Sequence, residues 1–489
     1  MGVKVVQQQQ FPLDGAVQKK ELRMNSAELR KHNTLEARPM VAIRGKLYDL
    51  TDFVDRHPGG RDIMLLSAGR DVTQVYETYH DMARTEKILR KYHVGTLTDS
   101  ALPTFPEPSP FQTTLRTRIS EHFRRTGHDP KFHPLHLIHY AVVIGAIVGS
   151  YYAQFFVPVV RDSLALSTIA ALVLGLFCAQ SCFTIVHDAS HASFSHKPWL
   201  WTAFGAWHDF MNGASHVAWF YQHVLGHHPY TNLPNADPDV ATSDKHFRRI
   251  RPHQKWFMPY LHQHLYAPIA YSFYGLKSRW DDVSNIYLTQ SRGAIAINPL
   301  QPHQHAIFWA GKAFFLLHRI VLPALFCVSL RRTLWLFFWA DVATSLTLAL
   351  VFQANHVVEH VAWPHPDKDT NIVPVDWMEM QIETAQDYGH DHFLTTKFTG
   401  ALNYQVVHHA FPNICQWWYT DIAPIVKQTC KEYNVTYHLR DTFYEAIKDH
   451  IDLLWVLGRD TQSTGCATAG VVDAASASPG YINGAMKEE

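Results

Sequence analysis

Cysteine is scarce in this sequence, and the few cysteines form no pattern. Six occur among 489 residues, and none belongs to a CxxC pair. A disulfide-stapled secreted scaffold is therefore not expected, and a reducing compartment fits the cysteine usage better. The formal net charge is zero, because 43 basic side chains balance 43 acidic ones. A nucleic-acid partner is not expected either, since such proteins usually carry a basic face or domain.

A secretory signal is lacking as well, because residues 1–32 are polar and include a glutamine run at 7–10. What is present in excess is histidine, with 33 residues, beside a hydrophobic content of 47% and an aromatic content of 13%. The positions of the histidines and of the long apolar runs therefore decide how the chain is interpreted.

Residues 25–98 are predicted to form a small α+β domain, after a disordered N-terminus at 1–24. Asn25 can cap a first helix with Glu28 at its third position. Residues 41–50 alternate like a β-hairpin with Gly45 in the turn, and helical patterns follow at 61–68 and 72–79. Four prolines between residues 103 and 110 predict a stiff linker, so we place a domain boundary at 99–112.

Long apolar runs begin after this linker. Residues 132–160 and 163–186 contain no Asp, Glu, Lys or Arg, and each is long enough to cross a hydrocarbon layer about 30 Å thick. They predict a transmembrane hairpin. A second pair of spans is predicted at 313–330 and 334–354, with Asp341 facing the protein interior, and a buried pair of globular core helices is the alternative. These runs place an all-α membrane domain at 113–458, with about four spans and a histidine-rich cytosolic cap, before a disordered tail at 459–489.

The sequence HPGG at residues 57–60 is followed by a second histidine, so that His57 and His80 lie 23 residues apart. Two imidazoles on opposite walls of a cleft can hold a planar macrocycle, and Gly59 and Gly60 let the backbone turn sharply beside the first. Together with the hairpin and the helix pair, these residues resemble cytochrome b5 over about 24–98, with Met24 as a departure. The resemblance implies haem b ligated by His57 and His80. With both axial positions filled, the domain is expected to transfer electrons.

Three further histidine clusters stand at the ends of the apolar runs. They are HDASH with His187 and His191, QHVLGHH with His223, His227 and His228, and QVVHH with Gln405, His408 and His409. On an α-helix, the i, i+4 spacing places His187 with His191, and His223 with His227, on single faces. Seven imidazoles and one amide are too many ligands for one zinc, so the count predicts two ions. Imidazole alone leaves iron, copper, zinc and nickel open. The sequence has no HExxH motif, which argues against a zincin protease.

The boxes HxxxH, HxxxHH and QxxHH, in this order, resemble those of the membrane fatty acid desaturases. The cytochrome b5-like N-terminus and the glutamine in the third box are similar to the front-end subgroup, and the resemblance runs from about residue 24 to 458. It implies a non-haem di-iron centre held by these eight residues, which activates O2 and removes two hydrogens from adjacent methylenes. It also implies a ligand from the last span, for which His356 is the candidate. Asn355, Asp188 and Asp387 are candidates for orienting the imidazoles, with ordinary caps and surface polar residues as the alternative.

The resemblance implies partners and a location. Electrons are expected to pass one at a time through the fused haem from a separate NADH-cytochrome b5 reductase, because the sequence shows no dinucleotide fingerprint. The substrate is expected to be a membrane lipid or an acyl-CoA. The expected location is the endoplasmic reticulum membrane, with several spans and with the haem domain and histidine boxes on the cytosolic side.

A front-end enzyme inserts a cis double bond between an existing one and the carboxyl end of a polyunsaturated acyl chain. The local sequences at 222–232, 383–391, 401–409 and 431–438 most resemble the Δ5 branch, which makes arachidonoyl or eicosapentaenoyl chains, although Ala410 stands where the family usually has Leu. Δ4, Δ6, Δ8 and sphingoid-base desaturation stay open, as does a di-iron lipid hydroxylase. A haem-linked metal transporter or sensor is a further alternative, but it predicts metal-binding residues within the spans and not at their ends.

Overall fold

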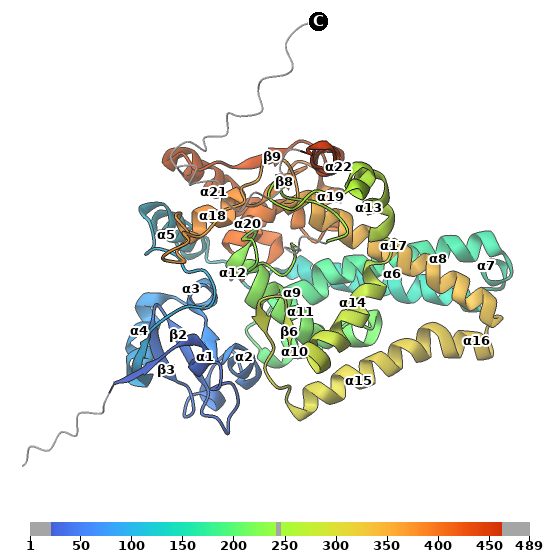
Figure 1. The fold of residues 1–489 in the computed structure, drawn as a ribbon. Coiled ribbons are helices and arrows are strands. Elements are labelled where there is room, and N and C mark those ends of the chain that lie inside the picture. The colour runs from blue at the N-terminus through green and yellow to red at the C-terminus, as the bar shows by residue number, and fades with distance from the viewer. Residues whose placement is uncertain (1–20, 241–245, 462–489) are drawn as a thin grey trace, which may run out of the picture.

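The computed structural model describes residues 21–240 and 246–461, so the disordered ends predicted at 1–24 and 459–489 lie largely outside the described residues. Three parts are distinct: an N-terminal α+β domain, a set of long helices, and a mostly helical cap at one end of those helices. In Figure 1 the N-terminal domain lies against the cap at the lower left, and the long helices project to the right.

The N-terminal domain is built on a five-stranded sheet with the order β1-β5-β3-β2-β4. The predicted hairpin is confirmed as antiparallel β2 and β3, joined by Arg44 and Gly45 with φ of 48° and 68°. The capping box between Asn25 and Glu28 is also present. The strands are β1 (Leu22–Met24), β2 (Met40–Ile43), β3 (Lys46–Asp49), β4 (Arg70–Asp71) and β5 (His93–Leu97), and the helices are α1 (Ser26–Leu29), α2 (Arg61–Ser67), α3 (Thr73–Tyr79) and α4 (Met82–Leu89). Helices α2 and α3 confirm the helical patterns at 61–68 and 72–79.

The proline-rich segment after this domain runs along the cap. Thr104 forms a parallel bridge with Ile372. Ser109 caps helix α5 (Pro110–Thr126), and its backbone N–H donates to Asp376. These contacts hold the start of α5 on the cap.

Four helical runs are long and apolar enough to cross a membrane, which confirms the four predicted spans: Pro134–Phe156, Leu164–Ser190, Pro302–Phe326 and Leu330–His356. They comprise α6 (Pro134–Phe156), α8 (Leu164–Ser181), α15 (Pro302–Leu316), α16 (Leu322–Phe326) and α17 (Leu330–His356), with the short α7 (Pro158–Asp162) between the first two. The third span begins at Pro302, earlier than predicted, where Gln301 and Gln304 form a capping box. A π-helical turn at Leu317–Val321 carries the helix through Arg319, whose guanidinium lies 5.9 Å from the ring of Phe337. Asp341 pairs with Arg279 at 2.7 Å and so faces the protein, as expected.

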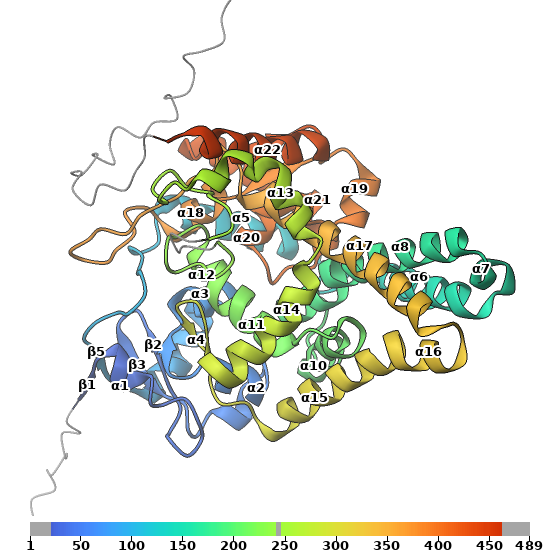
Figure 2. The ribbon, with the colours of Figure 1, turned by 45° about the vertical axis from the view of Figure 1, so that its right-hand side comes forward.

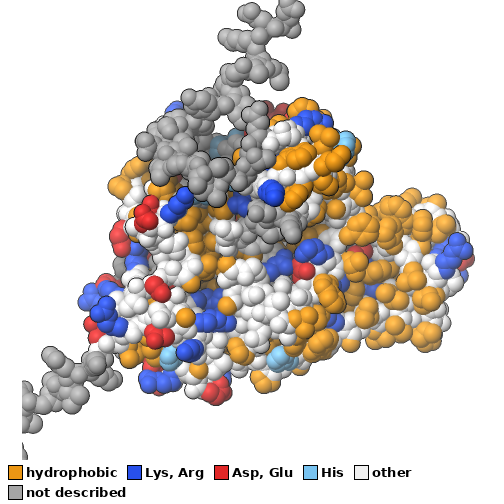
Figure 3. All heavy atoms as spheres, viewed as in Figure 1, with side chains coloured by type: hydrophobic (Ala, Val, Ile, Leu, Met, Phe, Trp, Pro, Cys, Tyr) orange, Lys and Arg blue, Asp and Glu red, His pale blue; other side chains and the backbone are white. Residues whose placement is uncertain are grey.

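Helices α8 and α17 pack closely. A Cβ atom added to Gly175 of α8 would lie 2.2 Å from the carbonyl oxygen of Ala340 in α17, so only glycine allows this approach. The Thr344 hydroxyl donates to the Gly175 carbonyl at 3.0 Å. The outer faces of the spans are exposed and apolar, as at Val148 and Ile169, and Figure 3 shows this hydrophobic surface over the projecting helices. Such a surface suits contact with lipid.

The cap combines the last turn of the second span and the segment up to the third span with the segment after the fourth. Its first part contains α9 (His187–Ser190), α10 (Pro198–Trp207), α11 (His216–Gln222), α12 (His228–Tyr230), α13 (Gln263–Tyr271), α14 (Tyr274–Val283), β6 (Ser291–Arg292) and β7 (Ile295–Ala296). Its second part contains α18 (Trp377–Glu383), β8 (Gln386–Tyr388), α19 (Phe393–Phe398), α20 (Gln405–Ala410), α21 (Tyr419–Tyr433), β9 (His438–Arg440) and α22 (Phe443–Arg459). Figures 1 and 2 show both parts at the same end of the spans. This arrangement brings the three predicted histidine clusters together.

Candidate metal centres

The first candidate centre lies in the N-terminal domain, where the rings of His57 and His80 face each other. Their centroids are 5.9 Å apart. This separation leaves room for one metal ion with a bond of about 2 Å to a ring nitrogen on each side. His57 follows a 3-10 turn at Val54–Arg56, and His80 ends α3. The Nδ1 atom of His80 lies 3.0 Å from the Tyr76 carbonyl, which leaves Nε2 for a ligand.

Glycine is required beside His57. A Cβ atom at Gly59 would lie 2.7 Å from Cε1 of the His57 ring, and Gly60 has a φ of +89°. The backbone can therefore turn next to the imidazole only because these positions lack side chains.

Aromatic rings flank both imidazoles. Phe53 lies edge-on to His57 with centroids 5.7 Å apart, and Tyr76 stacks on His80 at 4.6 Å. Burial, together with repulsion from His80, lowers the pKa of His57 to about 4. Burial also lowers the pKa of His80. Neutral imidazole is the form that binds metal, so the cleft is prepared for an axially ligated group.

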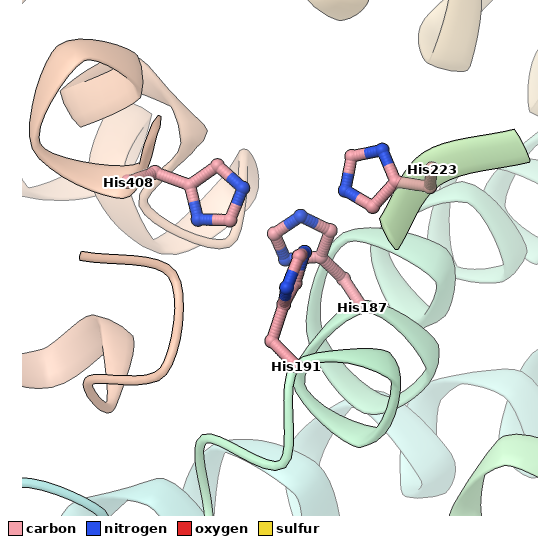
Figure 4. A group of neighbouring side chains, drawn as sticks. All are labelled: His187, His191, His223 and His408. Atoms are coloured by element: carbon pink, nitrogen blue, oxygen red, sulfur yellow. The ribbon is translucent and has the colours of Figure 1, made fainter. Parts of the chain in front are cut away.

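The second candidate centre lies in the cap, where the three clusters and the end of α17 converge. The ligand atoms form groups within 4.8 Å of one another: His187, His191, His223 and His408; His227, His356 and His409; His228, His408 and His409. A further group contains His223, His227 and Asp239. Figure 4 shows the four rings of the first group pointing toward one another from three separate segments. All the histidines in these groups are at most 5% exposed.

The helix that carries the second cluster departs from the expected α geometry. His223–His227 form a π-helical turn, in which the backbone N–H of His228 donates to the carbonyl of His223. The rings of His223 and His227 are still neighbours, with centroids 5.6 Å apart. In addition, the turn brings Nε2 of His228 within 3.2 Å of Nε2 of His223, which α periodicity would not predict. A second π-helical turn, at Cys182–Val186, precedes the first cluster. Such turns are frequent at functional sites.

Five of the converging imidazoles are held at Nδ1 by an oxygen atom. The contacts are His191 to the Tyr79 hydroxyl (2.8 Å), His227 to the Asp237 carboxylate (3.1 Å), His356 to the Thr384 carbonyl (3.0 Å), His408 to the Tyr419 hydroxyl (3.1 Å) and His409 to Gln381 Oε1 (2.8 Å). An imidazole that donates from Nδ1 keeps the lone pair on Nε2 free for a metal. The Nε2 atoms of His187, His191 and His409 are buried and have no hydrogen-bond partner among the described residues.

Charge around these rings is controlled by burial and by Asp237. Burial and the neighbouring imidazoles hold the pKa values of His191, His223 and His228 well below the usual range, and those of His408 and His409 likewise. At His227, burial acts in the same direction, but the carboxylates of Asp237 and Asp239 outweigh it and raise the pKa to about 9.

Gln405 lies beside His356, although its oxygen does not point there. Its Nε2 atom is 2.8 Å from Nε2 of His356, while its Oε1 atom accepts a hydrogen bond from Asn355 at 3.0 Å. Asp387 accepts from the backbone N–H of Val406 at 2.7 Å and so fixes the first turn of α20. Asp188 binds Tyr140 and Gln416. Asn355 and Asp387 thus contact the third cluster directly.

The side of the cage that faces the spans is aromatic. The indole of Trp219 stacks on His223 with centroids 4.5 Å apart and packs against Phe352 of α17 at 6.0 Å. Apolar rings thus flank His223 on this face of the cage.

Sequence reasoning missed Tyr79, Asp237, Gln381, Thr384 and Tyr419, which hold the imidazoles in place. A local signal existed only for Asp237, because a pair of carboxylates follows the second cluster in the segment ADPD (236–239). Tyr419 follows His408 by only 11 positions but belongs to no motif, and Gln381, Thr384 and Tyr79 lie 28 or more positions from the histidines that they contact.

Comparison with known proteins identifies the same two parts. The family described as cytochrome b5-like heme/steroid binding domain matches residues 25–98, and the fatty acid desaturase family matches residues 163–441. A protein of Mortierella alpina named acyl-lipid (8-3)-desaturase is 48% identical over 431 residues, which cover 88% of this chain and 96% of that protein. A protein of Dictyostelium discoideum named Delta(5) fatty acid desaturase A is 38% identical over 440 residues, covering 89% of this chain and 93% of that protein.

The described residues fit the cofactors of these families. The cleft with two neutral, facing imidazoles suits haem, and the buried cage of converging Nε2 atoms suits two non-haem irons, with O2 as co-substrate. The chain therefore belongs to the fatty acid desaturase family, as a membrane-embedded front-end acyl-lipid desaturase with its own cytochrome b5 domain.

Proposed function

We propose that this enzyme is a Δ5 desaturase, which inserts a cis double bond into C20 polyunsaturated acyl chains to give arachidonoyl or eicosapentaenoyl products. Two relatives from Dictyostelium discoideum support this position, because they are named Delta(5) fatty acid desaturase A and probable Delta(5) fatty acid desaturase C, at 38% and 37% identity. The observation that carries the desaturase chemistry is the convergence of eight buried histidines from four segments on one point of the cap.

The ligands that we assign to the two irons are His187, His191, His223, His227, His228, His356, His408 and His409, with Gln405 beside His356. His57 and His80 are assigned to the haem. When bound, the di-iron centre together with O2 supplies the oxidising power that removes two hydrogens from adjacent methylenes, which is beyond any acid–base side chain.

The protein contributes positioning and dryness. The oxygen partners at Nδ1 hold five imidazoles with Nε2 directed inward, so that little reorganisation is needed during turnover. Burial of the cage histidines to at most 5% exposure excludes bulk water, and the rings of Trp219 and Phe352 offer apolar contacts to an acyl chain that arrives from the membrane.

Electrons reach the site through the fused haem domain. An NADH-cytochrome b5 reductase supplies them, in the endoplasmic reticulum membrane, with the haem domain and the cap on the cytosolic side. The haem domain and both parts of the cap lie at the same end of the spans, so they face the same side of the membrane. Fusion keeps the donor at a high effective concentration.

The test is expression in a host that makes no polyunsaturated fatty acids, fed one fatty acid at a time. The panel contains eicosatrienoic and eicosatetraenoic acids with the nearest double bond at Δ8, and C18, C20 and C22 acids that report Δ6, Δ8 and Δ4 activity. Mass spectrometry then locates the new double bond. We expect a Δ5 product from the first two acids. Conversion only of the other acids would contradict the Δ5 assignment, and addition of oxygen without loss of hydrogen would contradict desaturation.

Two variants control this assay. His408→Ala removes a histidine of the cage and is expected to abolish conversion, whereas His262→Ala changes an exposed histidine of the cap and is expected to leave it intact. Full conversion by His408→Ala would contradict the assigned ligands.

A further inference from the structure

The N-terminal domain is held firmly against the cap by Asn298. The side chain of Asn298 is only 2% exposed, and its Nδ2 atom donates to the carbonyls of Leu65 (2.7 Å) and Ala68 (2.9 Å) at the end of α2. Its Oδ1 atom accepts from Arg70 at 3.1 Å. The haem-binding domain is therefore docked in a defined orientation and not merely tethered.

Because of this docking, the hydroxyl of one tyrosine of the haem-binding domain contacts a histidine of the metal cage. Tyr79 is the last residue of α3 and precedes His80 directly. Its hydroxyl lies 2.8 Å from Nδ1 of His191. His191 belongs to the first histidine group, and its Nε2 atom is buried without a partner among the described residues.

The contact matches those that hold the other imidazoles. His408 has an equivalent tyrosine, because the Tyr419 hydroxyl lies 3.1 Å from its Nδ1 atom. Tyr419, Asp237, Thr384 and Gln381 all belong to the membrane enzyme domain, whereas Tyr79 comes from the haem-binding domain. Tyr79 thus supplies one of the five oxygen contacts to the imidazoles of the cage, and only one peptide bond separates it from a haem ligand.

We propose that Tyr79 is a positioning residue that couples the two metal centres: it holds His191 in the cage and provides the shortest covalent and hydrogen-bonded connection, from His80 through Tyr79 to His191. The inference rests on the proposed di-iron function. The step that it assists is the transfer of one electron, in which a ferrous haem is oxidised to ferric while one ferric ion of the di-iron centre is reduced to ferrous. Two such transfers restore the di-ferrous form, and NADH supplies both electrons through the reductase. Tyr79 itself is neither oxidised nor deprotonated.

The test compares two reactions of the full-length protein that carries the substitution Tyr79→Phe. In the first, haem and both irons are reduced chemically before O2 and substrate are added, so that one desaturation per chain needs no electron from the haem. In the second, NADH and the reductase drive many turnovers, and the haem must deliver every electron. The absorption spectrum of the haem is recorded during the second reaction.

We expect Tyr79→Phe to slow the first reaction about 10–100-fold, the usual effect of losing an outer contact of a metal-binding histidine, as Tyr419→Phe does. In the second reaction, the rate is expected to fall by a clearly larger factor, because electron transfer from the haem is impaired as well. The haem is then expected to accumulate in its reduced form, because electrons arrive from the reductase but leave slowly. Wild-type rates in both reactions would overturn the proposal. An equal loss in both reactions would also overturn it, since Tyr79 would then only stabilise the cage.

Two further variants make the comparison specific. Tyr287→Phe removes another tyrosine hydroxyl that contacts an Nδ1 atom, that of His305 at 2.9 Å, away from the cage, and should change neither reaction. Tyr419→Phe disturbs the cage from within the membrane enzyme domain and should slow both reactions by a similar factor. If the wild type itself yields no product in the first reaction, the proposed function fails. The redox state of the haem in Tyr79→Phe still reports the coupling separately.

Discussion

Substituting Asp237 by Asn tests whether the contacts around the imidazoles control the metal centre. Asp237 is 3% exposed and binds His227 Nδ1 at 3.1 Å, the backbone N–H of Asn232 at 2.9 Å and that of Asp239 at 2.9 Å. Asparagine has the same shape, but it loses the charge and one acceptor oxygen. His227 then loses the carboxylate that keeps Nδ1 protonated. One of the two backbone N–H groups, of Asn232 or Asp239, faces the side-chain NH2 group and loses its acceptor.

Asp237→Asn is expected to have two effects, one on metal binding and one on the free energy of unfolding. Loss of the carboxylate partner of a metal-binding histidine typically lowers metal affinity or activity about 10–100-fold, which corresponds to about 1.4–2.7 kcal/mol. The unsatisfied buried N–H should lower the free energy of unfolding by about 1–3 kcal/mol. Iron binding therefore suffers beyond what a general loss of stability would cause.

A second aspartate separates these two effects. Asp376 is also buried, at 5% exposure, and accepts from the backbone N–H groups of Met378 (2.9 Å), Glu379 (3.1 Å) and Ser109 (2.9 Å), but it contacts no histidine of the cage. We expect Asp376→Asn to be destabilised similarly and to keep its non-haem iron. The assay measures non-haem iron per chain, conversion of a fed fatty acid and thermal unfolding for both variants. Full iron content and conversion in Asp237→Asn would refute the reasoning.

Three further substitutions have clear expected outcomes. His356→Ala should lose about half of the non-haem iron and all conversion, whereas His360→Ala, four residues beyond the end of α17 and outside the cage, should keep both, as metal analysis would show. Gly59→Ala should abolish haem binding, seen as loss of the haem absorption band, because its Cβ atom would lie 2.7 Å from the His57 ring; a normal spectrum would contradict this. Gly175→Ala should lower the free energy of unfolding by about 1–3 kcal/mol through overpacking against Ala340. Gly145→Ala, where no atom lies within 4 Å of the added Cβ, should leave the free energy of unfolding unchanged.

Local patterns predicted much of this molecule. The hairpin of the N-terminal domain follows from alternation around Gly45, and the first helix from the capping box of Asn25 and Glu28. The four spans follow from uncharged length, and their even number places the segments that carry the histidine clusters at one end of the spans. These features depend on residues that are close in sequence, which a pattern can register.

What the sequence did not predict depends on contacts between distant segments. The π-helical turn at His223–His227 has the same apolar pattern as an α-helix, so the approach of His228 to His223 could not be foreseen. A π-helical turn carries the third span through Arg319, whose guanidinium packs near the ring of Phe337 in the fourth span. Tyr79 contacts His191 across 112 positions of sequence, and only the docked domain brings them together.

The most direct test of the central claim is a count of iron in the purified full-length protein that desaturates a fed fatty acid. We expect one iron extractable as haem and two non-haem irons per chain, with the two non-haem irons lost in His187→Ala and the haem retained. A protein that forms the double bond while holding haem iron alone, or a His187→Ala variant that keeps both non-haem irons and full conversion, would contradict the assigned di-iron centre.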